Sequence, residues 1–152
     1  SADDYAKWVA YLLSAWPPRD GADAGPVRRS TVRELAQGSN FPSLQKRNGK
    51  GGDSPCRLPG TYGMGMYAAV DCDLGRLLSH SGGYPGYGSH VLLLPNRGVG
   101  IFAFANGTYA DASAPVWDAA FALDKAGLLG QARKKPVSNE LTSSRDLRRA
   151  EA

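Results

Sequence analysis

A four-residue turn between two apolar runs constrains the fold of this chain more than any other feature. Pro95-Asn96-Arg97-Gly98 has the composition of a tight turn, and it separates His90–Leu94 from Val99–Ala105. The two runs are therefore expected to pair as an antiparallel hairpin. The second run is apolar at almost every position, which predicts a central strand that is buried on both faces.

A further strand pattern precedes this hairpin. Residues 62–70 alternate in a way that favours a strand with one face against helices. Asp71–Gly75 supplies a turn, and Arg76–His80 is expected to return antiparallel, so the sheet would have about four strands. Residues 39–60 are rich in Gly, Pro, Ser and Lys without an apolar period, which predicts an irregular surface loop.

Three segments have a helical pattern of apolar residues: 3–16, 27–37 and 114–126. In the first, aromatic and aliphatic side chains form one stripe that we expect to pack into the core. Ser1 and Asp4 resemble a capping box at its start, and Ser113 is the predicted N-cap of the third helix. Helices packed on an antiparallel sheet give an α+β fold class.

The length and charge distribution indicate one domain followed by a tail. A chain of 152 residues that is 42% hydrophobic is long enough to bury a core, and we assign residues 1–130 to that domain. Residues 131–152 are expected to form a polar basic tail or to begin a further helix. Of the net charge of +4, residues 133–152 carry +3, from six basic and three acidic side chains. Because the excess lies in the tail and not on the folded body, no nucleic-acid partner is expected.

Two negative expectations concern membranes and processing. No apolar run approaches the roughly 20 residues needed to cross a bilayer, so no membrane span is expected. The chain does not open on a basic and then apolar leader, so no signal peptide is expected at Ser1. Ser1 already lies in a helix pattern, which is typical of a chain cut from a longer one.

The cysteines and histidines exclude one kind of site. Two cysteines and two histidines do not have the paired spacing of a structural zinc site, so no metal and no cofactor are expected. Cys56 and Cys72 either form one disulfide that closes a short loop, which would suit an exported protein, or are two unrelated thiols. The sequence leaves both alternatives open.

The segment from His80 to Ser89 combines a histidine and a serine with four glycines, which are Gly82, Gly83, Gly86 and Gly88. Glycine at a strand edge often marks the close approach of a ligand. An edge N–H that glycine leaves bare can donate to a developing oxyanion, where one donor contributes about 3 kcal/mol. On composition alone, a flexible hairpin loop with a surface histidine is the simpler interpretation.

Several short motifs between residues 62 and 123 follow one another at a fixed spacing. They are Tyr62-Gly-Met-Gly-Met66, His80-Ser81-Gly82, Gly86-Tyr-Gly-Ser89, Leu94-Pro95 and the run from Val99-Gly-Ile101 to Asn106. This series resembles the C-terminal part of the serine beta-lactamase and penicillin-binding-protein family. It is most similar to class C beta-lactamases, related esterases and D-alanyl-D-alanine carboxypeptidase-like proteins. His80-Ser81-Gly82 stands where class C enzymes have their third motif, Lys-Thr-Gly.

The resemblance implies acyl-enzyme chemistry, in which a serine of an S-x-x-K motif attacks a carbonyl and water hydrolyses the intermediate. By position, the Gly83 N–H would be an oxyanion donor, the Ser81 hydroxyl would bind the acyl or carboxylate end of the substrate, and Gly82 would allow close approach. His80 replaces a lysine and lacks its fixed positive charge, which favours an ester or peptide substrate over a beta-lactam. Asn106, at the end of the strand, would either contact substrate or cap the strand.

The acylating residues themselves are not recognisable in this chain. Ser43-Leu-Gln-Lys46 matches S-x-x-K, but a match this short is expected by chance and no Y-x-N lies between it and His80. We therefore expect the nucleophile to lie upstream of Ser1, which makes the upstream part of the polypeptide an expected partner. This chain alone would then be inactive. His90 lies outside the motif and is interpreted as a structural histidine.

These observations predict a fragment of a beta-lactamase-related serine hydrolase that acts on a small-molecule or peptide acyl substrate. The alternative is a non-catalytic binding or accessory domain with the same fold. The habit of the family implies export to the periplasm or the cell exterior.

Overall fold

A computed structural model of the chain describes residues 1–18, 21–23, 25–48 and 55–130. Six strands form one antiparallel sheet whose spatial order is the chain order: β1 (Asn40–Asn48), β2 (Pro55–Tyr62), β3 (Tyr67–Asp71), β4 (Gly75–Tyr84), β5 (Tyr87–Leu94) and β6 (Val99–Ala105). The helices are α1 (Ala2–Leu13), α2 (Arg29–Glu34) and α3 (Ser113–Lys125). The predicted α+β class is confirmed, with six strands in place of about four. The predicted tail, 131–152, lies outside the described residues.

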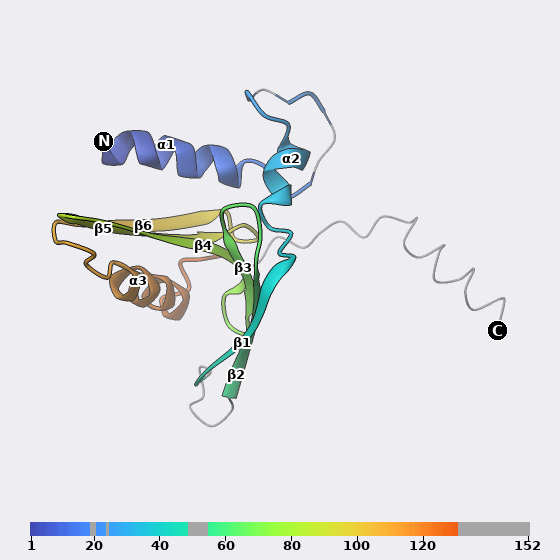
Figure 1. Cartoon of the computed structure of the whole chain (residues 1–152). Helices are drawn as coiled ribbons and strands as arrows, with labels where there is room; N and C mark the ends of the chain where they lie inside the picture. Colours follow the sequence, from blue (N-terminus) through green and yellow to red (C-terminus); the bar gives the residue numbers. More distant parts are fainter. Residues whose placement is uncertain (19–20, 24, 49–54, 131–152) are drawn as a thin grey trace, which may run out of the picture.

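Two helices cover opposite faces of the same part of the sheet. α1 lies over one face of β4, β5 and β6, and α3 lies under the other (Figure 1). Side chains alternate along β4 and β5 between two buried clusters. The cluster on the α1 face includes Val9, Leu12, Trp16, Leu78, Val91 and Leu93. The cluster on the α3 face includes Leu77, Leu92, Leu94, Val116 and Ala120.

The first hairpin corrects the prediction of an irregular loop over 39–60. β1 and β2 pair from Asn40 opposite Tyr62 to Asn48 opposite Pro55. β2 has one covered face, because Cys56 and Leu58 are buried and the residues between and after them, Arg57 and Pro59, are exposed. β1, at the edge of the sheet, has no buried residue over 40–46. Exposed apolar side chains result, and Phe41 is 82% exposed. Backbone pairing with β2 therefore forms β1 without the sequence pattern that strand prediction requires.

The strand predicted over residues 62–70 is interrupted. β2 ends at Tyr62 and β3 begins at Tyr67, and the two residues are paired across the intervening turn. Within the turn, the Gly63 N–H donates to the Met66 carbonyl at 2.8 Å, and Gly65 has a φ of +80°, a conformation that favours glycine. The small residues of the pattern therefore mark a turn and not the outward face of one strand.

The apolar run of β6 is not a central strand. The predicted hairpin with β5 is confirmed, but β6 is the last strand of the sheet, and most of its residues are half-buried. The run is apolar on both sides because its residues pack towards α1 and α3 alternately. α1 approaches so closely that a Cβ at Gly100 would lie 2.3 Å from the Val9 side chain.

The helices begin close to their predicted starts; α1 and α2 are shorter than expected, and α3 has the expected length. The capping box of α1 is confirmed, since the Asp4 N–H donates to Ser1 Oγ at 3.2 Å. The N-cap of α3 is Ala112 and not Ser113, whose N–H instead donates to the Asp111 carboxylate at 2.8 Å. No helix within the described ranges is long and apolar enough to cross a membrane.

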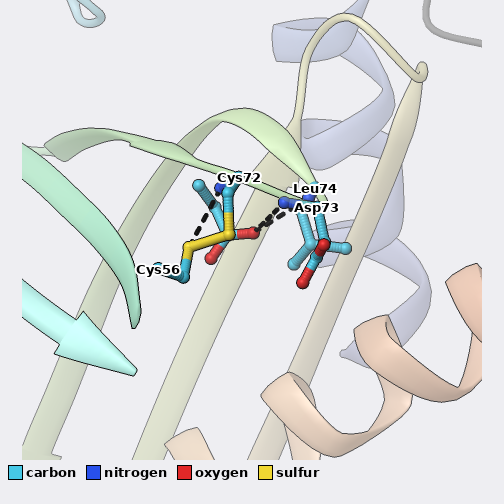
Figure 2. The surroundings of a disulfide bond; sticks show 5 residues. Cys56, Cys72, Asp73 and Leu74 are labelled. Carbon is cyan, nitrogen blue, oxygen red and sulfur yellow. Dashed lines mark hydrogen bonds between the residues drawn. A yellow bond between two sulfur atoms is a disulfide. The ribbon is translucent and has the colours of Figure 1, made fainter. Parts of the chain in front are cut away.

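A disulfide joins Cys56 of β2 to Cys72, in the turn between β3 and β4. Figure 2 shows the bond together with the hydrogen bond from the Cys72 N–H to Cys56 Sγ. The buried Asp71 carboxylate accepts from the N–H groups of Asp73 and Leu74, at 2.8 and 2.9 Å, and so fixes the turn. Of the two alternatives that the sequence leaves open, the structure has the disulfide.

Candidate functional site

The outer half of β4, His80–Tyr84, has a strand on one side only. β3 pairs with β4 no further than Tyr67 opposite Ser79, whereas β5 pairs with it as far as Tyr84. All five residues of the outer half are exposed. Among the residues that the structure describes, no strand pairs with the second edge of His80–Tyr84, which we call the open edge.

The turn that follows determines which backbone groups face the open edge. Tyr84 and Tyr87 pair across Pro85-Gly86, and Gly86 has the positive φ, +94°, of a two-residue turn. The Gly82 carbonyl accepts from Ser89 Oγ of β5 at 3.5 Å, so it faces β5. Because N–H and C=O groups of successive strand residues point alternately to the two edges, those of Gly83 face the open edge.

His80 lies on the α1 face of the sheet and contacts a tyrosine that the sequence analysis did not place in the site. The Tyr62 hydroxyl is 2.9 Å from His80 Nε2, and the pair lies where β2 ends. The Tyr62-Gly-Met-Gly-Met66 motif contained this tyrosine, but its spacing in sequence gave no indication of a contact. Beside the pair is a cavity of about 340 Å³, lined by Tyr5, Trp8, Met64, Met66, His80, Ser81, Gly82 and Ser89 among others.

Ser81 and His90 form a second polar pair on the opposite face. Ser81 is opposite His90 in the β4–β5 register, and Ser81 Oγ is 2.7 Å from His90 Nδ1. His90 is 7% exposed, and burial is the main cause that lowers its pKa below 6.5, with His80 adding to this and Asp111 opposing it. The His90 imidazole is therefore neutral at pH 7. Counting outward from Pro85-Gly86 as the turn would have paired Ser81 with His90 from the sequence.

A second cavity, of about 520 Å³, lies at the tip of the β4–β5 hairpin. Its lining combines glycines with exposed rings: Gly82, Gly83, Tyr84, Tyr87, Gly88, Ser89 and Phe104. The two cavities share Gly82 and Ser89, so the glycine pair of β4 lies between them. A substrate could therefore reach the open edge at Gly83 with groups extending to both sides.

The remaining candidates lie elsewhere. Asn106 directly follows β6 and is exposed, and β5 separates it from β4. Ser43 lies on β1, where its Oγ is 2.5 Å from the Tyr67 hydroxyl. Ser43 and Lys46 are three residues apart on a strand, so their side chains point to opposite faces, whereas the same spacing on a helix would bring them together.

One of the comparisons with known proteins gives a match. The family model described as Beta-lactamase matches residues 1–124. No curated protein and no solved structure gives a significant match. The matched region runs from α1 through the whole sheet and includes all but the last residue of α3. Since it covers most of the sequence, including the open edge and both polar pairs, the chain belongs to the beta-lactamase family.

Proposed function

We propose that the open edge of β4 is the substrate edge of a serine hydrolase that forms and hydrolyses an acyl-enzyme. The observation that carries the proposal is the open edge of His80–Tyr84, which has no strand partner among the described residues and lies between two cavities. The Gly83 N–H, directed outward, is the proposed oxyanion donor. A second donor is expected to be the N–H of the nucleophilic serine itself.

The side chains of β4 have distinct proposed roles. The Ser81 hydroxyl hydrogen-bonds the acyl or carboxylate end of the substrate, and Gly82 leaves room for it. His80, held by the Tyr62 hydroxyl at 2.9 Å, is the proposed catalytic side chain that exchanges a proton at the edge. Without a fixed positive charge at His80, the site favours an ester or peptide over a beta-lactam. Asn106 remains a proposed substrate contact at the end of β6.

The nucleophile is proposed to lie in sequence that precedes Ser1. Support comes from β1, where Ser43 and Lys46 point to opposite faces and cannot act together. The chain alone is then inactive, and the preceding segment of the same polypeptide is its partner. Export to the periplasm or the cell exterior is part of the proposal, and the Cys56–Cys72 disulfide supports it because such bonds persist in oxidising compartments.

The same observation on Ser43 favours one alternative, a binding or accessory domain without chemistry. The coding sequence ahead of Ser1 separates the two functions. An S-x-x-K followed by Y-x-N supports the hydrolase. A start codon close to Ser1 supports the binding domain and removes the catalytic proposal.

The oxyanion assignment is tested in the full-length natural protein with a p-nitrophenyl ester. Gly83→Pro removes the outward N–H, and Gly83→Ala keeps it. Because a Cβ at Gly83 would lie 2.6 Å from the Tyr109 ring, both are made with Tyr109→Ala. We expect the proline variant to lose about 100-fold in acylation rate relative to the alanine variant. Equal rates would show that the Gly83 N–H is not a donor to the oxyanion.

A further inference from the structure

The buried ring of His90 has one nitrogen in contact with Ser81 and one without a hydrogen-bond partner among the described residues. Nδ1 is 2.7 Å from Ser81 Oγ, and Nε2 has no hydrogen-bond partner in the part of the chain that the structure describes. A buried imidazole nitrogen without a partner is uncommon, and it restricts where the proton of the neutral ring can lie.

The two neutral tautomers leave different groups unsatisfied. A proton on Nε2 would bury an N–H donor without an acceptor, and Nδ1 would then accept from the Ser81 hydroxyl. A proton on Nδ1 would donate to Ser81 Oγ and leave only a lone pair unpaired at Nε2. Buried N–H groups without an acceptor are rarer in proteins than acceptors with an unused lone pair. The contacts of His90 therefore favour the Nδ1–H tautomer.

We propose that His90 is a positioning residue that makes the Ser81 hydroxyl a hydrogen-bond donor towards the substrate. With Oγ accepting from His90 Nδ1–H, the Ser81 O–H is free to point to the open edge. The site then selects a substrate with an acceptor there, a carboxylate or a carbonyl oxygen. The opposite tautomer would leave Ser81 only lone pairs and would select an amine or another donor. The substrate preference in this proposal rests on the proposed function, whereas the tautomer of the His90 ring rests only on its contacts.

The charges around His90 come from two elements. Asp111, in the segment before α3, raises the pKa of His90, and His80 on β4 lowers it, while burial is the largest effect and also lowers it. The net direction keeps the ring neutral at pH 7, so that one nitrogen holds the proton. A protonated ring would also donate from Nδ1. The Ser81 hydroxyl therefore still accepts from His90 and donates to the substrate when His90 gains a proton.

Nitrogen NMR tests the tautomer directly on this chain. The chain has two histidines, so His80→Gln leaves His90 as the single imidazole in a ¹⁵N-histidine-labelled sample. We expect the proton on Nδ1 at pH 7, and a lower population of that tautomer when Ser81→Ala removes its acceptor. A proton mainly on Nε2, or an even mixture of tautomers, would overturn the proposal.

Kinetics of the full-length natural protein test the consequence for substrate choice. His90→Asn keeps an N–H near the position of Nδ1, and His90→Leu removes it. For an ester substrate with a free carboxylate, we expect His90→Leu to raise KM about tenfold with less effect on kcat, and His90→Asn to restore KM. The methyl ester of the same substrate should show the smaller change. A uniform fall in kcat for both substrates would contradict the positioning role.

The two experiments separate this proposal from the hydrolase proposal. If the proton lies on Nδ1 but the full-length protein shows no turnover, only the proposed function is contradicted. If the proton lies on Nε2 and the full-length protein is active, only the proposed role of His90 is contradicted.

Discussion

The two halves of β4 belong to one strand but have different environments. The inner half, Gly75–Ser79, is paired with β3 along its whole length and also with β5 at Leu78 and Ser79. Leu77 and Leu78 are completely buried, facing α3 and α1 respectively. The outer half, His80–Tyr84, is exposed and paired with β5 alone. The inner half uses its backbone and side chains for stability. Among the described residues, the outer half has backbone donors without a strand partner, which the proposed binding of a carbonyl oxygen requires.

Truncating one side chain in each half of β4 should give the largest difference in the free energy of unfolding. Leu78→Ala should lower the free energy of unfolding by about 2–5 kcal/mol, because Leu78 is buried against α1 and a cavity would remain. Ser81→Ala, three residues further on, should lower it by less than about 1.5 kcal/mol. Urea unfolding monitored by tryptophan fluorescence measures both. Equal losses would contradict the division of β4.

The disulfide lies beside the inner half, so its removal should affect stability and leave the open edge unchanged. Cys56 and Cys72 are 16 residues apart, and the bond should contribute about 3 kcal/mol by restricting the unfolded chain. Urea unfolding of Cys56→Ala/Cys72→Ala against the oxidised chain gives the value. The backbone NMR shifts of His80–Tyr84 should not change. A change in these NMR shifts would show that the structure of the outer half depends on the disulfide.

Gly83 and Gly88 face each other across the β4–β5 hairpin, but only Gly88 lies against backbone atoms that cannot move. A Cβ at Gly88 would lie 1.8 Å from the Ala110 backbone carbonyl, whereas one at Gly83 would meet the Tyr109 ring, which is 66% exposed and can move. Gly88→Ala should therefore destabilise the fold by about 1–3 kcal/mol and Gly83→Ala by less. Thermal unfolding of both variants is the measurement. A larger loss for Gly83→Ala would reverse the interpretation.

The smallest effect should be the pH dependence from His90. Its pKa is lower in the folded chain than its ordinary 6.5, so the unfolded chain binds the proton more tightly. Stability from this group is complete above about pH 6.5 and decreases as the pH falls below it. The carboxyl pKa values of Asp4 and Asp111 are lowered from 3.8, so these groups act at more acidic pH. Urea unfolding between pH 8 and 5 should show the decrease in the natural chain and not in His90→Asn.

The sequence was sufficient where local chemistry decides the structure. The capping box at Ser1, the turn at 95–98 and the hairpin that it joins depend on residues close in the chain. β1 does not follow from the sequence pattern because its side chains lie in solvent, and β2 does not because its buried face is short, with Cys56, Leu58 and Gly60. β6 is an edge strand with the apolar pattern of a central one because two helices cover it. The contact of Ser81 with His90 follows from the register once Pro85-Gly86 is taken as the turn. The contact of Tyr62 with His80 joins strands that are not neighbours in the sheet, so no single motif or turn indicates it.

Amide hydrogen exchange of this chain, followed residue by residue in NMR spectra, tests the open edge most directly. Because alternate amides face β5, we expect slow exchange at Gly82 and fast exchange at Ser81 and Gly83. In the inner half, Leu78 and Ser79 should both exchange slowly, since both edges are paired there. Slow exchange at Gly83 together with fast exchange at Gly82 would show that the Gly83 N–H faces β5, and the oxyanion assignment would be wrong.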